Sequence, residues 1–182
     1  MEMKRANPNA LKNLEINLGA LAGAETRVGW FAGSAYPSGR PVAAVAAGNE
    51  LGIPSRSIPP RPFMRPTVAE KQPSAWPAAA ATLSKRVLDG KMSAFVAMDT
   101  FGAIAEGDIA ATIAKVTSPP LSPITLGARK YRQEGKTVTG ATIGEIAGKL
   151  KAGTLDVSGV STKPLEDSFT MLNTLTHETS VA

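Results

Sequence analysis

A proline-rich segment between residues 53 and 66 limits what this chain can fold into more than any other stretch. Its prolines are Pro54, Pro59, Pro60, Pro62 and Pro66. Because proline lacks a backbone N–H and fixes φ, such a segment is excluded from the middle of a regular helix and from a central strand. We therefore expect residues 53–66 to form an ordered, extended loop.

Apolar residues recur at three- and four-residue steps on both sides of this loop, which is the spacing of amphipathic helices. The expected helices cover residues 9–23, 41–52, 67–90, 92–116, 122–132 and 142–151. We expect local breaks at Pro73 and Pro77 inside the third of these helices. Gly102 and Gly107 weaken the fourth helix, so we expect a kink or a break there.

Two segments near the ends of the chain have the β-branched, alternating pattern of strands, residues 26–31 and residues 170–181. Because helices outnumber strands and the strands lie near both ends, we expect the terminal strands to pair in one small sheet. The prediction is an α+β fold with several helices packed on a small, mostly antiparallel sheet. Residues 1–182 are expected to form one domain.

Composition excludes several kinds of site. The chain has no cysteine, so disulfides and thiolate metal sites are excluded, and His177 is its only histidine. We expect neither a metal nor a cofactor. No stretch approaches the ~18 apolar residues of a membrane helix, and no apolar signal core follows the first residues, so we expect synthesis in the cytoplasm and no membrane partner. The net charge of +5 suits a nucleic acid or an acidic protein equally.

The proline-rich loop also carries side chains that protein interfaces favour. Phe63 and Met64 are apolar anchors, and the arginines offer planar forks for carboxylates. We interpret the loop as a docking surface; the alternative is that it covers the protein's own core. The residues expected at the interface are Asn49, Glu50, Arg56, Pro60, Arg61, Pro62, Phe63, Met64 and Arg65.

A basic cluster with one aromatic residue lies at the end of the fifth expected helix. Arg129, Lys130 and Arg132 surround Tyr131, and Lys136 follows. One interpretation places these four cations on DNA phosphates, without sequence specificity. The other, which we favour, is a helix C-terminus where cations offset the helix dipole.

Carboxylates on the longest expected helix raise the question of an enzyme. Asp99 and Glu106 are seven residues apart and can share a helix face, where paired carboxylates perform acid–base chemistry or hold a metal. A solvated helix face is the commoner cause of this spacing. His177 beside Glu178 likewise fits a surface pair on a strand. We therefore expect no catalytic residue.

The tripeptide at residues 135–137, Gly-Lys-Thr, matches the end of a phosphate-binding loop. Such a loop needs a strand ahead of it and a glycine at the position that Lys130 occupies here. We therefore expect no nucleotide site.

The loop and the helix before it together resemble virion morphogenesis proteins of long-tailed phages. Residues 42–52 contain Asn-Glu-Leu-Gly, and residues 58–66 begin Ile-Pro-Pro-Arg-Pro-Phe. The family pattern is Asn-Glu, an aromatic or aliphatic residue and Gly, followed by Ile-Pro-x-Arg-Pro-Phe. Further along, residues 120–125 and 135–137 resemble the family's downstream helix and its exit.

A last segment agrees with the family in part. Residues 163–165 read Lys-Pro-Leu, similar to the family's Lys-Pro-Leu-x-Asp-Thr-Gly before the last strand. Here Asp167 is followed by Ser168 and Phe169 where the family has Thr-Gly, so the turn before the last strand is expected to differ. The resemblance spans roughly residues 27 to 181, and its strongest element is residues 49–65.

These relatives are the tail-completion and head-to-tail joining proteins, including those similar to minor tail protein Z. The resemblance implies an α+β fold, no catalysis, and a homo-oligomeric ring of six or twelve copies at the head-to-tail junction. Such a ring completes or terminates the tail; a head-completion, connector or minor tail protein is the alternative. The implied partners are neighbouring neck, connector and tail-tube proteins, and the implied location is the virion, after synthesis in the host cytoplasm.

Overall fold

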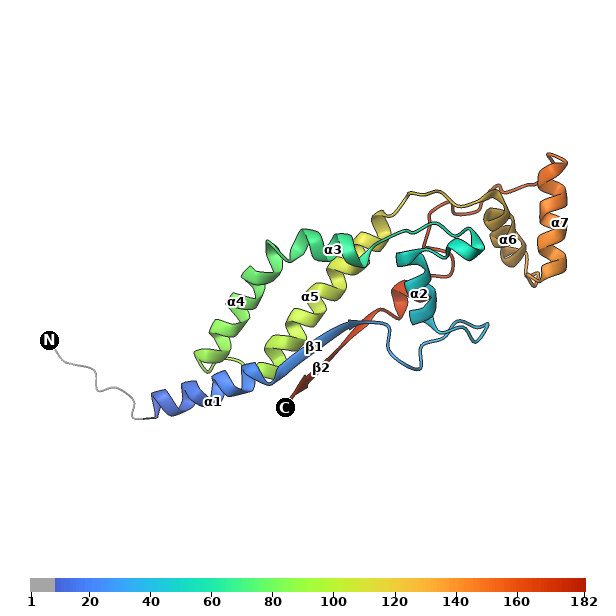
Figure 1. Ribbon diagram of the computed structural model, residues 1–182. Helices are drawn as coiled ribbons and strands as arrows, with labels where there is room; N and C mark the ends of the chain where they lie inside the picture. Colours follow the sequence, from blue (N-terminus) through green and yellow to red (C-terminus); the bar gives the residue numbers. More distant parts are fainter. Residues whose placement is uncertain (1–8) are drawn as a thin grey trace.

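The computed structural model describes residues 9–182, in which helices pack around a two-stranded antiparallel sheet and extend beyond it at both ends (Figure 1). The strands are β1 (Ala24–Gly29) and β2 (Thr176–Val181). The helices are α1 (Ala10–Ala22), α2 (Val42–Leu51), α3 (Met64–Lys71), α4 (Ala75–Leu88), α5 (Ala94–Lys115), α6 (Pro123–Gln133), α7 (Gly140–Lys151) and α8 (Thr170–Asn173), with a 3-10 turn η1 (Pro54–Arg56). This is the α+β fold that the sequence predicts.

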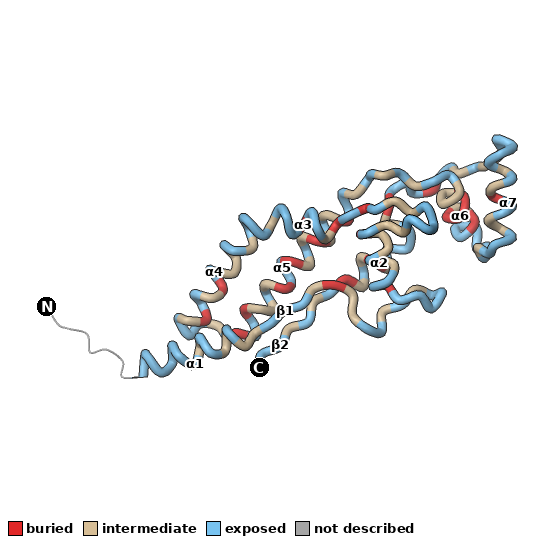
Figure 2. The backbone as a smooth tube through the Cα atoms, in the orientation of Figure 1, coloured by how far each residue is buried: buried red, intermediate tan, exposed pale blue. Residues whose placement is uncertain are grey.

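The molecule is elongated, with α1 at one end and α6 and α7 at the other (Figure 1). Three apolar clusters hold the described residues together, and the buried segments are spread along the length of the chain (Figure 2). The central cluster consists of Val42, Ala46, Phe63, Ile109, Ile113, Met171 and Leu175. A second lies where α4 meets α5, and a third joins α6 to α7. A long molecule of this kind leaves large surfaces exposed at both ends.

The sheet pairs the two ends of the described chain, as expected. Ala24 lies opposite Val181, and Gly29 lies opposite Thr176. The sheet packs on α5, where Gly102 permits a close approach. A Cβ atom at this glycine would lie 2.6 Å from both Thr26 Oγ1 and a ring carbon of His177. Gly102 and Gly107 do not break the helix, because α5 runs as one helix from Ala94 to Lys115.

The proline-rich loop ends earlier than the sequence predicts. Helix α3 begins at Met64, so Pro66 belongs to the first turn of a helix rather than to an extended loop. A proline fits there because the first N–H groups of a helix have no partner within it. The expected break at Pro73 is confirmed, since α3 ends at Lys71 and α4 starts at Ala75. Pro77 causes no break, because it lies in the first turn of α4.

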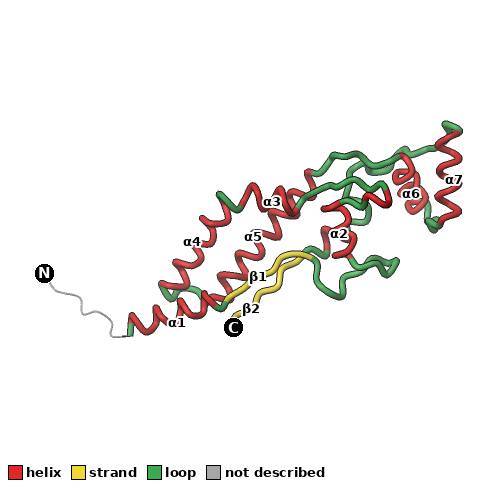
Figure 3. The backbone as a smooth tube through the Cα atoms, in the orientation of Figure 1, coloured by secondary structure: helices red, strands yellow, loops and turns green. Residues whose placement is uncertain are grey.

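The final strand is shorter than expected. Residues 170–173 form α8, and only Thr176–Val181 pairs as a strand (Figure 3). Met171, in this helical turn, and Leu175, just after it, are both buried in the central cluster. The first strand also ends before Trp30, whose indole N–H donates a 2.7 Å hydrogen bond to the carbonyl oxygen of Met171.

The remaining expected helices are confirmed within two residues at each end, as α1, α2, α5, α6 and α7. Helix α6 begins as predicted, with Ser122 as its N-cap and Pro123 at its first position. Among residues 9–182, no helix combines the length and apolar character needed to cross a membrane.

Candidate functional site

A buried carboxylate on α2 holds the start of α3. Glu50 accepts hydrogen bonds from the backbone N–H of Phe63 at 2.6 Å and of Met64 at 2.9 Å. It also accepts from Arg65, through the backbone N–H at 3.1 Å and the side-chain Nε at 2.9 Å. The N-cap residue Phe63 has no side-chain group that could cap the helix. Glu50 therefore supplies the cap from a neighbouring helix.

The charge of Glu50 is part of this arrangement. Burial by itself raises the pKa of the Glu50 carboxyl, but the Phe63 N–H and the Arg65 side chain favour the ionised form more strongly, and the resulting pKa lies below its ordinary value. Only 8% of Glu50 is exposed. The sequence predicts Glu50 at an interface with another subunit, but its carboxylate instead binds residues 63–65 of its own chain.

Arg61 also uses its side chain for hydrogen bonds within its own chain. Its Nε atom donates to the carbonyl oxygen of Pro119 at 2.8 Å, and its Nη2 atom donates to that of Pro120 at 2.9 Å. Burial lowers the pKa of the guanidinium group. These bonds tie the proline-rich loop to the segment between α5 and α6. Arg61 thus uses two of its donors on backbone carbonyls rather than on a partner's carboxylates.

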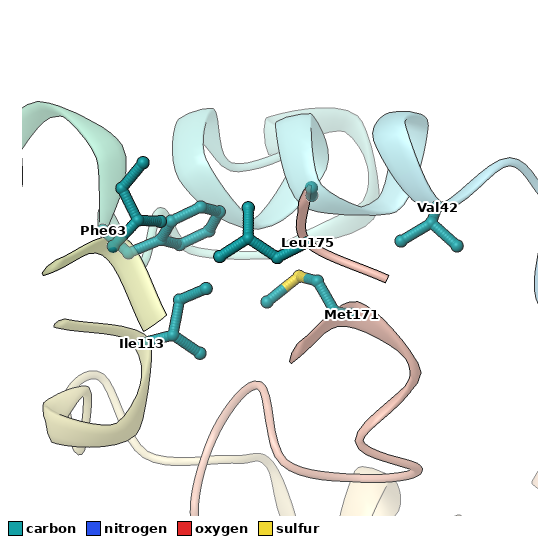
Figure 4. Packing of buried hydrophobic residues seen from close by; sticks show 7 residues of the cluster. Val42, Phe63, Ile113, Met171 and Leu175 are labelled. Atoms are coloured by element: carbon teal, nitrogen blue, oxygen red, sulfur yellow. The ribbon is translucent and has the colours of Figure 1, made fainter. Parts of the chain in front are cut away.

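Phe63 belongs to the protein's own core. Its side chain has no exposed surface, packs with Ile113 and Leu175, and meets the ring of Trp30 edge-to-face with the ring centres 5.7 Å apart (Figure 4). The prediction that Phe63 is an exposed interface anchor is therefore wrong. Phe63 is the N-cap residue of α3, and its side chain points toward Ile113 of α5.

The other expected interface residues differ in exposure. Arg56, Pro60, Pro62 and Arg65 are exposed, whereas Asn49 and Met64 are half-buried. Asn49 is also used internally, because its backbone oxygen accepts a 2.7 Å hydrogen bond from the N–H of Arg61. The exposed members lie on the outer side of the loop.

The basic cluster on α6 is largely neutralised within the chain. Arg129 is 5% exposed, and its Nη1 atom donates to the carbonyl oxygens of Ser161 at 2.7 Å and Lys163 at 2.9 Å. Burial lowers the pKa of its guanidinium, an effect that Asp167 opposes. A side chain buried in this way cannot lie on a DNA phosphate. The prediction of a DNA contact through Arg129 is therefore wrong.

The other three cations of that cluster also have partners. Lys130 donates to the carbonyl oxygen of Ser158 at 3.0 Å, and Lys136 pairs with Glu134 at 2.7 Å. Arg132 pairs with Asp167 at 2.6 Å. Lys130 and Arg132 lie in the last turn of α6, as the helix-end interpretation expects. Gly135 follows this helix rather than a strand, so the expectation of no phosphate-binding loop agrees with the fold.

Residues from both predicted sets come together in one cleft of about 800 Å³. Arg56 and Arg61 of the loop line it together with Arg129 and Arg132 of α6, although the two pairs are far apart in the sequence. The cleft lies between the loop after α2, the start of α6 and the segment before α8. Other lining residues include Tyr36, Arg40, Ile58, Ser122, Leu165 and Asp167.

The cleft carries a strong positive charge. Five arginines and a single aspartate line it, a net charge of +4. Arg40 and Arg56 are exposed and make no hydrogen bond or ion pair through their side chains with any residue in the described range. Burial and the nearby Asp167 raise the pKa of Tyr36, against the opposing influence of Arg40. Guanidinium groups arranged in this way bind carboxylates or phosphates.

A second charged group lies outside the cleft, at the contact of β2 with α5. His177 lies between Glu106, with Nδ1 at 2.7 Å, and Asp99, with Nε2 at 3.3 Å. The two carboxylates thus share a helix face, as expected, but that face meets the sheet. His177 pairs with them rather than with Glu178. Within residues 9–182, no group of three or more acidic, histidine or cysteine side chains has an arrangement suited to a metal.

Sequence reasoning missed two charged residues of the cleft, Arg40 and Asp167. Arg40 closes a tight turn, because the N–H of Tyr36 bonds to the carbonyl oxygen of Arg40 at 2.9 Å. In the sequence, a charged residue directly after the turn-forming Pro-Ser-Gly could have indicated that Arg40 is a candidate site residue. Asp167 follows the Lys-Pro-Leu segment, but only the fold brings it to α6.

Comparisons of the chain with protein-family models, curated proteins and solved structures give no match.

Proposed function

We propose that this protein is a non-enzymatic structural subunit of a phage virion, which assembles into a ring at the head-to-tail junction and completes or terminates the tail. Its partners are other copies of the same chain and the adjacent neck, connector and tail-tube proteins. The resemblance of residues 42–66 to virion morphogenesis proteins supports the phage assignment. One structural observation, the exposed apolar surface of α1, supports assembly.

Helix α1 carries its large apolar side chains on the outside. Leu11 is 81% exposed, Leu14 43% and Leu18 57%, all three on one face of the helix, and no residue of α1 is buried. Complete burial of a Leu or Ile side chain contributes roughly 1.5–3 kcal/mol. Contiguous exposed apolar surface of this kind marks a contact site. Another copy of the chain is the occupant we propose for it.

The two ends of the molecule offer unlike surfaces. The apolar helix α1 lies at one end, and the arginine-lined cleft lies near α6 toward the other (Figure 1). A closed ring of identical subunits uses heterologous contacts, in which one patch meets a different patch of the next copy. An elongated chain with different patches toward its two ends has the geometry that such a contact requires.

Native mass spectrometry of the purified chain tests this proposal. We expect the wild type to form a ring of six or twelve copies and the double variant Leu11→Glu/Leu18→Glu to remain monomeric. The matched control is Lys12→Glu, which changes the net charge by the same two units at an exposed position of α1 and should preserve the ring. Both variants should keep the wild-type circular dichroism, because the altered side chains are exposed.

Two results would contradict the proposal. A wild-type chain that stays monomeric at every concentration would remove the ring, and a double variant that assembles normally would remove α1 from the contact. Imaging of purified virions with a labelled antibody tests the location separately. Absence of the chain from virions would remove the phage assignment.

A further inference from the structure

Most of the net charge of this protein is concentrated in the cleft. The chain as a whole has a net charge of +5, and the side chains that line the cleft have a net charge of +4. Low-dielectric walls focus the field of charges gathered in a concave surface. The positive potential of the cleft should therefore attract an anionic group.

Asp167 indicates which anionic group the arginines accept. Its carboxylate lies 2.6 Å from Nη2 of Arg132 and 3.2 Å from Nε of Arg129. That Nε atom is buried and makes no hydrogen bond with acceptable geometry, so the internal carboxylate does not fully satisfy it. Arg40 and Arg56 line the same cleft and have no side-chain ion pair among residues 9–182, so they can pair with a further carboxylate. The arginines of the cleft thus already bind one carboxylate, that of Asp167, and can bind further carboxylates.

The rest of the lining favours a peptide over a nucleic acid. Ile58, Leu121 and Leu165 add apolar surface, and the remaining wall includes three prolines and five serine or threonine residues. Tyr36 is the one aromatic residue of the lining, whereas single-stranded nucleic acids are held on several stacking aromatic side chains. A lining that combines arginines with apolar side chains suits a peptide that presents both acidic and apolar side chains. The N-terminus of α6, at Ser122, adds a favourable dipole for an anion.

We propose that this cleft binds an extended acidic segment of a neighbouring protein subunit. The carboxylates of that segment pair with Arg40, Arg56 and Arg132, while its apolar side chains lie against Ile58 and Leu165. The inference rests on the proposed function, because assembly at the head-to-tail junction is what supplies the neighbour. It adds the chemical identity of the partner surface, which ring formation alone does not specify.

The probe is a fluorescein-labelled octapeptide of six glutamates and two leucines, titrated with the full chain and followed by fluorescence anisotropy at low salt. We expect binding that weakens as salt is added. An octapeptide with glutamine in place of glutamate should not bind. In the double variant Arg40→Gln/Arg56→Gln, affinity should fall by at least about tenfold, since the loss of even one charge-assisted contact has roughly that effect.

Two variants make the test specific. Arg86→Gln/Lys151→Gln removes the same charge from exposed sites outside the cleft and should leave affinity within about twofold, because distant surface charges are screened. Asp167→Asn removes the competing carboxylate and should strengthen binding. Circular dichroism confirms that each variant is folded.

Three results would overturn the inference. These are no binding of the acidic peptide, an equal loss in both double variants, and tighter binding of a single-stranded oligonucleotide of equal charge that Arg40→Gln/Arg56→Gln abolishes. The last result would assign the cleft to nucleic acid. If the chain forms rings but does not bind the peptide, only the proposed role of the cleft is contradicted. If the chain binds the peptide but never assembles, the proposed function is contradicted, while the specificity of the cleft for acidic peptides stands.

Discussion

The Nδ1 atom of His177 in β2 lies 2.7 Å from the Oε2 atom of Glu106 in α5. With the second contact to Asp99, this bond fastens the last strand to the longest helix. The hydrogen bond to Glu106 raises the pKa of His177 above its ordinary value, although partial burial opposes the shift. The protonated imidazole is therefore the form that stabilises the fold.

The sign of this shift predicts how stability depends on pH. The stabilisation from His177 is fully present below its unfolded-state pKa of about 6.5 and is lost as the pH rises through the higher folded-state pKa. We expect His177→Gln to remove a contribution of ~0.5–1 kcal/mol at pH 5 and to change little at pH 9. Urea unfolding at several pH values measures the difference in the free energy of unfolding between wild type and variant. Glu178→Gln, on the exposed face of the same strand, should keep the wild-type pH profile; a His177→Gln profile identical to wild type would refute the role of His177.

Replacing Phe63 tests whether it is a core residue or an interface residue. Because its side chain is completely buried and packs on Trp30, we expect Phe63→Ala to lower the free energy of unfolding by ~3–5 kcal/mol. Thermal melting followed by circular dichroism measures this. Phe169→Ala is the control, since half of that side chain is exposed. A Phe63→Ala chain that melts like wild type but does not assemble would restore the interface assignment.

Two glycines of α5 form a matched pair. A Cβ atom at Gly102 would meet Thr26 and His177 at 2.6 Å, whereas one at Gly107 would have no atom within 4 Å. We expect Gly102→Ala to destabilise the fold by roughly 1–3 kcal/mol through overpacking against the sheet. Gly107→Ala should stabilise it by about 0.5–1 kcal/mol through helix propensity. Denaturant unfolding of the two variants decides this, and equal effects would mean that the sheet does not rest on Gly102.

The helices could be predicted because their signals are local. Ser122 and Pro123 mark the start of α6 by their own capping and backbone preferences, and Pro73 separates α3 from α4 through its missing N–H. The end of the chain was harder to predict. Residues 170–175 have an apolar pattern compatible with either a strand or a helical turn, because a four-residue step places Met171 and Leu175 on one face of both, and in the fold both are buried in the central cluster.

The sequence by itself determined the helical segments, because periodicity and proline chemistry act between near neighbours. It also indicated the pairing of the terminal strands and the α+β class, because only two strand patterns occur and each needs a partner. The tertiary structure alone decided which side chains face inward. Phe63 and Arg129 have sequence surroundings typical of contact residues, yet both are buried, because burial depends on which distant segments pack over them. The same packing brings Arg40, Arg56 and Arg132 to one cleft, where their positive charges gather without any sequence motif that joins them.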